Sequence, residues 1–142
     1  ENAADQIKHY HKFTVNIPDE SFMLEMEQAG FISRREKIAK LGIDFQPSDL
    51  TQAPILNACP VVLDCEVDRI IEEDGICHIF AKILDRLAES DLLDDKGHFR
   101  NDSFAPTYFM WDGHKRVYRY LDNRVDPMGS FIKKARKKDD KS

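Results

Sequence analysis

The chain has 142 residues, of which 42% are hydrophobic and 33% are charged, and its net charge at pH 7 is −5. This length suits a single domain, and the composition is that of a globular protein and excludes a disordered chain. Because the apolar runs are too short to cross a bilayer and the net charge is negative, we expect neither a membrane nor a nucleic acid as a partner.

The three cysteines, at positions 59, 65 and 77, bear on the cellular compartment. An odd number of cysteines without a CxxC pair is typical of reduced thiols in a cytoplasmic protein, and the start of the chain shows no secretion signal. Cys65 and Cys77 lie within apolar runs, so we expect them in the core. We therefore expect a cytoplasmic protein with one domain over residues 1–142, which ends in a basic, disordered tail at 133–142.

The first expected elements are a short helix over residues 3–10 and a strand over residues 12–17. The strand is indicated by its alternation of polar and apolar side chains and by its β-branched residues. Pro18 should end it, because proline cannot donate a hydrogen bond to a neighbouring strand. The side chains expected to face inward are Phe13, Val15 and Ile17.

Two short helices are expected next. The first covers residues 22–28 and is closed by Gly30. The side chains that can cap its first turn are Asp19 and Ser21. The second helix covers residues 33–42, because Ser33 and Glu36 have the spacing of a capping box and a glycine follows.

The strongest strand signals form two hairpins. A long strand at 61–71 is followed by the turn signal Asp74-Gly75 and by a returning strand at 76–84. A second pair is expected at 107–111 and 115–121. The remaining segments are expected as loops at 43–53 and 92–104 and as a short helix at 128–138. These elements predict a mainly β fold, an antiparallel barrel with short helices between its strands.

The residues alone show no strong catalytic motif, neither a glycine-rich phosphate loop nor a protease or hydrolase signature. The histidines have no convergent partners, so we expect no metal site. His78 follows a turn at the start of a strand, and two interpretations stay open. It is either a half-buried strand residue bonded to the backbone or a contact to a ligand.

A cationic cluster lies at the start of the expected helix at 33–42. Ser33, Arg34, Arg35 and Lys37 stand where backbone N–H groups point outward, so an anion such as phosphate would be held well. The alternative interpretation is a solvated helix face. The residues alone therefore predict a β-rich domain with a candidate anion site.

Several stretches of the chain, in order, are similar to the sequence pattern of one known family. Residues 13–18 (FTVNIP) resemble the FxVNxP strand of flavin reductase-like, FMN-binding split-barrel proteins. The other stretches that match are 29–42, 53–67, 75–80 and 93–119. The resemblance covers the C-terminal two-thirds of such a protein, and the family's first strands would precede residue 1.

The resemblance implies a split β-barrel that dimerises with an identical chain and holds FMN non-covalently at the dimer interface. In such proteins the flavin takes a hydride from NADH or NADPH and passes its electrons on, in some cases to a partner protein. The residues implied to bind the cofactor are Asn16, Ser33, Arg34, Arg35 and Lys37. Lys37 matches the family best, and Arg34 stands where the family has a glycine.

The resemblance also implies a catalytic role for His78, at the place where a nicotinamide would stack on the flavin. One extra residue separates Gly75 from His78, compared with the family pattern. The function implied is an NAD(P)H-dependent flavin reductase. Two alternatives stay open: an FMN-binding electron carrier without nicotinamide turnover, and a non-catalytic barrel remnant that acts as an interaction module.

Overall fold

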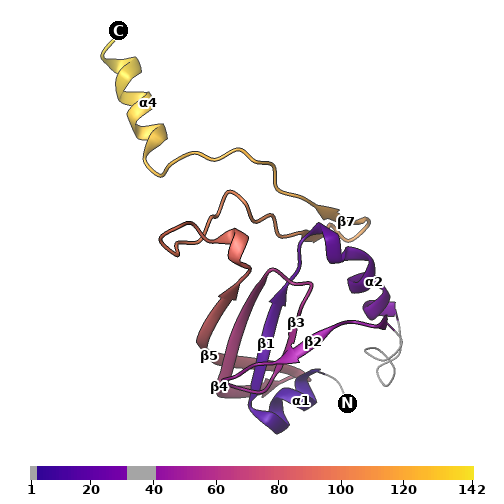
Figure 1. Ribbon diagram of the computed structural model, residues 1–142. Helices are drawn as coiled ribbons and strands as arrows, with labels where there is room; N and C mark the ends of the chain where they lie inside the picture. The colour runs from indigo at the N-terminus through magenta and orange to yellow at the C-terminus, as the bar shows by residue number, and fades with distance from the viewer. Residues whose placement is uncertain (1–2, 32–40) are drawn as a thin grey trace.

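A computed structural model describes residues 3–31 and 41–142 of the protein (Figure 1). The described chain is mainly β, with short helices between the strands, as the sequence predicts. The elements in chain order are α1 (Ala3–Tyr10), β1 (Lys12–Ile17), the 3-10 turn η1 (Glu20–Phe22), α2 (Met23–Phe31), β2 (Phe45–Pro47), β3 (Pro54–Leu56), β4 (Val61–Glu73), β5 (Ile76–Ala88), the 3-10 turn η2 (Ser90–Leu92), β6 (Tyr108–Trp111), β7 (Arg116–Arg119) and α4 (Ser130–Asp139). None of the described helices is long and apolar enough to cross a membrane.

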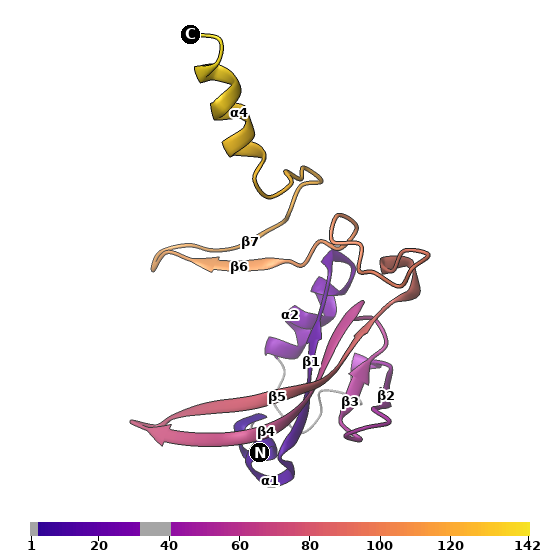
Figure 2. The same ribbon diagram turned by 90° about the vertical axis from the view of Figure 1, so that its left-hand side faces the viewer.

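The main sheet is antiparallel and has the strand order β1-β4-β5. β4 and β5 each have 13 residues and are joined at Asp74 and Gly75, which both adopt the positive φ angles that a tight hairpin turn requires. β1 pairs only with the first half of β4, from Ile17 opposite Val61 to Lys12 opposite Glu66. The outer half of the hairpin therefore extends past β1, and it curves where two irregularities interrupt the pairing (Figure 2).

The two edges of this sheet are open in the described part of the chain. Neither β1 nor β5 has a second neighbouring strand there. The exposed apolar side chains along β5 are Ile76, Phe80, Ile83 and Leu84. An open edge with exposed apolar side chains favours association with another chain, because it presents unpaired backbone groups and apolar surface together.

The buried carboxyl group of Asp64 on β4 organises the small core. Asp64 is only 1% exposed, and it accepts hydrogen bonds from the hydroxyl groups of Ser48 and Thr51, the second at 2.5 Å. The Ser48 hydroxyl in turn accepts the backbone N–H of Thr51 at 3.2 Å, and the Thr51 hydroxyl accepts that of Ala53 at 3.2 Å. These bonds fasten residues 48–53 to the middle of the sheet. The apolar side chains buried around them are Phe22, Ala53, Cys59, Val62, Cys65 and Leu92.

The structure confirms the five predicted strands and the first helix, and it differs from the sequence predictions in several details. Cys77, which was expected in the core, is half-buried, and residues 133–139 of the tail expected to be disordered lie in α4. Part of the expected loop at 43–53 forms β2, which pairs with β3. Helix α2 continues through Gly30 to Phe31, because Gly30 does not adopt the left-handed conformation that closes a helix. Val15, which was expected to face inward, is 41% exposed; among the described strands β1 has a ladder neighbour on one side only.

We expect Asp64→Ala to lower the free energy of unfolding by about 3 kcal/mol, because two buried hydroxyl groups lose their acceptor. The measurement is urea denaturation at pH 7. Asp68→Ala is the matched control, because Asp68 on the same strand is exposed and forms only a surface ion pair with Lys82 at 3.7 Å. That control should cost less than about 1 kcal/mol. Equal losses in the two variants would contradict the role assigned to Asp64.

Candidate functional site

A groove with a volume of about 640 Å³ lies between α1, β1 and the chain segment around β3. One wall is the face of α1 that carries Gln6, Ile7 and Tyr10, and the opposite wall consists of residues 51–54 together with Leu56. β1 forms the floor between these walls. This volume lies within the range of about 300–1,000 Å³ that is usual for small-molecule and cofactor sites.

The α1 wall is held against the outer half of β4. The helix ends at Tyr10, and the positive φ of 58° at the next residue, His11, turns the chain into β1. The carbonyl group of His11 accepts the backbone N–H of Val67 at 2.8 Å. On the other face of the helix, the Lys8 ammonium group donates to the Glu72 carboxylate at 2.6 Å. The helix is thus fixed to β4 at two points, and its remaining face is free to line the groove.

The floor of the groove is polar, and its side chains tie β1 to β3. The Asn16 amide donates to the Thr14 hydroxyl at 3.0 Å and to the Pro54 carbonyl at 3.4 Å. Its oxygen accepts the backbone N–H of Leu56 at 2.9 Å. The Thr14 hydroxyl also donates to the Pro54 carbonyl. Asn16 and Thr14 therefore act as a clamp between two strands that share no ladder of backbone hydrogen bonds.

Gln52 forms the outer rim of the groove and has a left-handed backbone with a φ of 63°. This conformation is unusual for a residue other than glycine, and here local hydrogen bonds hold it in place. The Gln52 backbone N–H and its side-chain amide both donate to the Ser48 carbonyl at 3.0 Å. Since Ser48 is bonded to Asp64, the position of the rim depends on the buried network.

The groove carries positive charge although the chain as a whole is acidic. Lys12 is the only cation among the described residues that line it, and no carboxylate lines it. The described residues hold no group of three or more side chains that could bind a metal ion. The groove is thus suited to a partly apolar anion rather than to a metal.

Two of the three cysteines are buried, and their thiols stay protonated near neutral pH. Burial, with a smaller effect of the Asp19 charge, raises the pKa of Cys59 to about 11. Burial and then the charge of Asp64 raise the pKa of Cys65. Neither thiol is therefore suited to act as a nucleophile.

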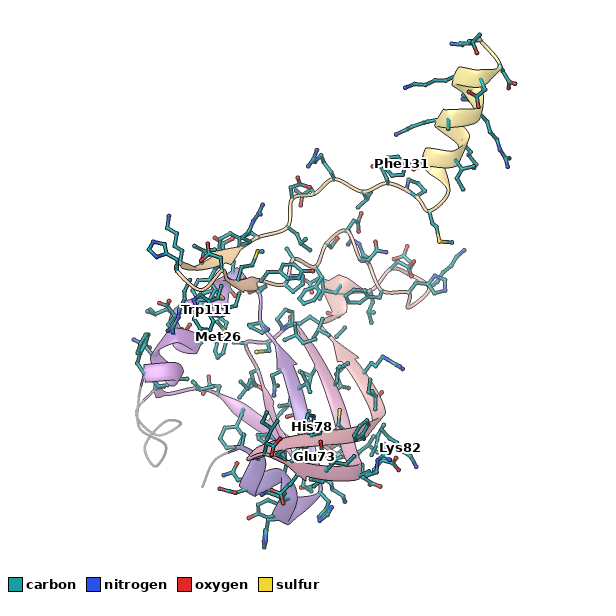
Figure 3. The ribbon with its side chains drawn as sticks, turned by 180° about the vertical axis from the view of Figure 1, so that it is seen from behind. Met26, Glu73, His78, Lys82, Trp111 and Phe131 are labelled. Carbon is teal, nitrogen blue, oxygen red and sulfur yellow. The ribbon has the colours of Figure 1, made fainter. Side chains whose placement is uncertain are left out.

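The structure places the predicted site residues in three different situations. Asn16 lies on the floor of the groove. His78 lies on β5 opposite Ile71, near the end of the hairpin, where it is exposed and does not line the groove (Figure 3). The four residues of the predicted phosphate site lie outside the described residues; they are Ser33, Arg34, Arg35 and Lys37.

The sequence prediction missed most of the groove. Lys12 and Thr14 share the polar face of β1 with Asn16, two residues apart each time. The same period-two alternation that predicted the strand could have identified both of them. Nothing in the sequence pattern identified Gln52, whose place depends on the bonds between its loop and Asp64.

We expect Asn16→Asp to lower the free energy of unfolding at pH 7 by about 1–3 kcal/mol, because it replaces an amide donor with a carboxylate oxygen facing the Pro54 carbonyl. The pKa of this new carboxyl group should be raised, because its charged form is disfavoured there. The deficit should therefore shrink as the pH is lowered toward 4, where protonation restores a donor. Asn57→Asp is the control, because Asn57 is exposed in the same segment. A deficit that does not depend on pH would contradict the clamp.

Comparison with known proteins agrees with this architecture. Residues 1–107 match the family model of the flavin reductase like domain. No curated protein matches the sequence.

Among solved structures, 2-nitrobenzoate 2-nitroreductase NbaA of Pseudomonas fluorescens is similar with 24% identity and a TM-score of 0.74, over 86% of this chain and 61% of that one. Flavoredoxin of Desulfovibrio vulgaris (Miyazaki F) has 22% identity and a TM-score of 0.76, over 89% of this chain and 67% of that chain. Flavin reductase HpaC, solved with NADP+, has 17% identity and a TM-score of 0.53, over 76% of this chain and 56% of that chain.

These similarities establish the fold, and the chain spans about three-fifths of the length of the nitroreductase. Because the family model matches three-quarters of the sequence, the assignment of the chain to this family does not depend on any single similar structure. The chain belongs to the flavin reductase-like family and has its split-barrel fold.

Proposed function

We propose that the protein is an FMN-binding flavoprotein and that it acts as an NAD(P)H-dependent flavin reductase. The observation that carries this proposal is the match to the flavin reductase like domain over residues 1–107, which includes every residue of the groove. The choice of FMN rests on the resemblance of the FTVNIP strand and the segments after it to FMN-binding split barrels.

The groove has the chemistry that a flavin requires, which is apolar surface for the ring, donors for its polar edge and a cation for its phosphate. Ile7 and Phe13 offer apolar surface, and the Tyr10 ring is 67% exposed at the groove. The side-chain amide of Gln6 can donate to the ring edge, and Lys12 can attract the phosphate. When bound, the flavin itself supplies the hydride chemistry, so the absence of a catalytic motif in the sequence fits the proposal.

We propose further that Arg34, Arg35 or Lys37 contacts the FMN phosphate, with Ser33 beside it. The triple variant Arg34→Ala/Arg35→Ala/Lys37→Ala should lose affinity for FMN by about 1–3 kcal/mol per contact removed. Quenching of flavin fluorescence measures this affinity, and riboflavin, which has no phosphate, is the matched ligand control. The variant should bind riboflavin as the wild type does. Unchanged FMN affinity would mean that these residues form a solvated helix face.

His78 does not line the groove of its own chain, so a flavin contacted by both Asn16 and His78 would need two copies of the chain. This is the homodimer that the resemblance implies, with the flavin site between subunits. The open edges of the sheet favour the same assembly, because they leave backbone groups and apolar side chains for a partner. In such a dimer, His78 of one copy would position the nicotinamide over the flavin held by the other.

We expect His78→Ala to keep bound FMN but to be reduced by NADH or NADPH roughly a hundredfold more slowly, because hydride transfer depends steeply on approach geometry. Stopped-flow bleaching of the flavin absorbance measures the rate. His98→Ala is the control, because His98 is an exposed loop residue that pairs only with Asp94. Wild-type reduction kinetics in His78→Ala would show that His78 is an ordinary strand residue.

A flavin-binding electron carrier is the second candidate function. The observation that favours it is the exposed position of His78 away from the groove. His78 is the residue that we expect to contact a nicotinamide, and none of the described residues that line the groove is assigned that role. A wild-type chain that binds FMN, is not reduced by NADH or NADPH, and accepts electrons from dithionite would support the carrier over the reductase.

A further inference from the structure

The C-terminal helix α4 packs against no other helix or strand in the part of the chain that the structure describes. Figures 1 and 2 both show it projecting from the body at the end of an extended arm. Phe131 and Ile132 are 68% and 60% exposed on it. At 3.6 residues per turn, these two side chains and Ala135 lie within one sector of about 100°, with Arg136 and Lys138 on either side of the sector. The helix thus presents a narrow apolar stripe with flanking cations.

The charge of this segment is opposite to that of the rest of the chain. Residues 130–142 hold six cations and two carboxylates, a net charge of +4, so the other 129 residues hold a net charge of −9. A body with this charge would be repelled by an anionic membrane or by a nucleic acid, although the helix alone would be attracted. The observations therefore favour an acidic protein surface as the partner of α4.

A second groove of the protein, which we call the acidic groove, carries the charge opposite to that of α4. A cavity of about 470 Å³ lies between the start of η1, the segment before β4 and the turn η2. Its carboxylates come from Asp19, Glu20, Glu89 and Asp91, and no cation lines it. Its apolar lining comes from Ala58, Pro60, Phe104, Ala105 and Tyr120, with the buried Leu92 beneath them. Among the described residues, no side-chain cation forms an ion pair with any of these four carboxylates.

The arm directs α4 away from this groove of its own chain. Tyr120 lines the groove, and the chain then runs outward from Leu121 to the helix (Figure 2). At the start of the helix, Gly129 adopts a left-handed conformation and Lys134 pairs with Asp126 at 3.6 Å. Both contacts lie within the arm and the start of the helix. Because the arm carries α4 away from the body, a second copy can bring its helix to this groove without refolding the arm.

We infer that α4 of one copy docks in the acidic groove of a second copy, with Phe131 and Ile132 toward the apolar surface and the flanking cations on the carboxylates. This contact is independent of the flavin site and of the proposed function. A zero-length carbodiimide cross-linker tests it, because it joins an ammonium group to a carboxylate only where the two are in contact. Equal amounts of ¹⁴N- and ¹⁵N-labelled full-length chains are unfolded and refolded together so that subunits mix, then cross-linked and analysed by mass spectrometry.

We expect peptides that join Lys134 or Lys138 to Glu20, Glu89 or Asp91 and that combine the two isotopes. Raising the salt from 0.05 to 0.5 M should reduce them at least about fivefold, because the contact is electrostatic and exposed. Cross-links confined to one isotope would show docking within one chain, and their absence would show no docking. Either result would overturn the inference. So would co-sedimentation with phosphatidylserine vesicles in place of the cross-links.

Charge reversal provides a stricter test with its own control. The helix variant Arg136→Glu/Lys138→Glu and the groove variant Glu89→Lys/Asp91→Lys should each lose the mixed-isotope cross-links when alone. Mixed together, they should regain them, because the groove variant still carries the wild-type helix and the helix variant still carries the wild-type groove. The control variant Lys96→Glu/Lys115→Glu changes the net charge as much as the helix variant does. Its two positions are exposed, in the loop before β6 and in the β6–β7 turn. It should cross-link as the wild type does. Failure of the mixture to regain cross-links would overturn the inference.

Discussion

The hydrogen bonds from Ser48 and Thr51 to the buried Asp64 are the interaction on which the rest of the structure depends. Asp64 lies in the first half of β4, the central strand of the sheet, where burial makes an unpaired polar group costly. The two hydroxyl groups satisfy it and thereby fix residues 48–53 beside the sheet. The same segment supplies the rim of the groove at Gln52 and leads into β3. A buried carboxyl group that does not itself line the groove thus sets the position of one wall of the candidate site.

The second determinant is the bent β4–β5 hairpin, which is much longer than the strand beside it. Its inner half pairs with β1 and carries Asp64, whereas its outer half supports α1 through Val67 and Glu72. The elements that enclose the groove are therefore all hydrogen-bonded to β4. Exposed apolar side chains remain along β5, an edge strand of the described sheet, which fits a domain whose assembly with a second copy we propose.

Much of this fold could be predicted from the sequence, because its strands follow local rules. The alternation in residues 12–17 and the Asp74-Gly75 turn specify β1 and the hairpin without reference to the rest of the chain. β2 and β3 could not be predicted, because three-residue strands form where tertiary contacts bring Phe45 opposite Leu56. Gly30 misled the prediction for a similar reason, since a glycine closes a helix only when it adopts positive φ.

The candidate site was less predictable than the fold. Asn16 was found through a family pattern, and its clamp between β1 and β3 depends on a neighbour 38 residues away in the sequence. The groove also needs the bonds of Ser48 and Thr51 to Asp64, which no periodicity reveals. The exposed position of His78 reflects the length of the hairpin beyond β1, and the family pattern alone does not give its relation to the groove.

The central claim of this account is that the groove between α1, β1 and the β3 segment holds the flavin. The most direct measurement is the change in backbone amide NMR shifts of the ¹⁵N-labelled chain on titration with FMN. The account predicts saturable shifts concentrated in residues 6–16 and 51–56, with residues 130–139 unaffected. Saturable shifts that leave residues 6–16 and 51–56 unchanged, or no shifts at all, would contradict it.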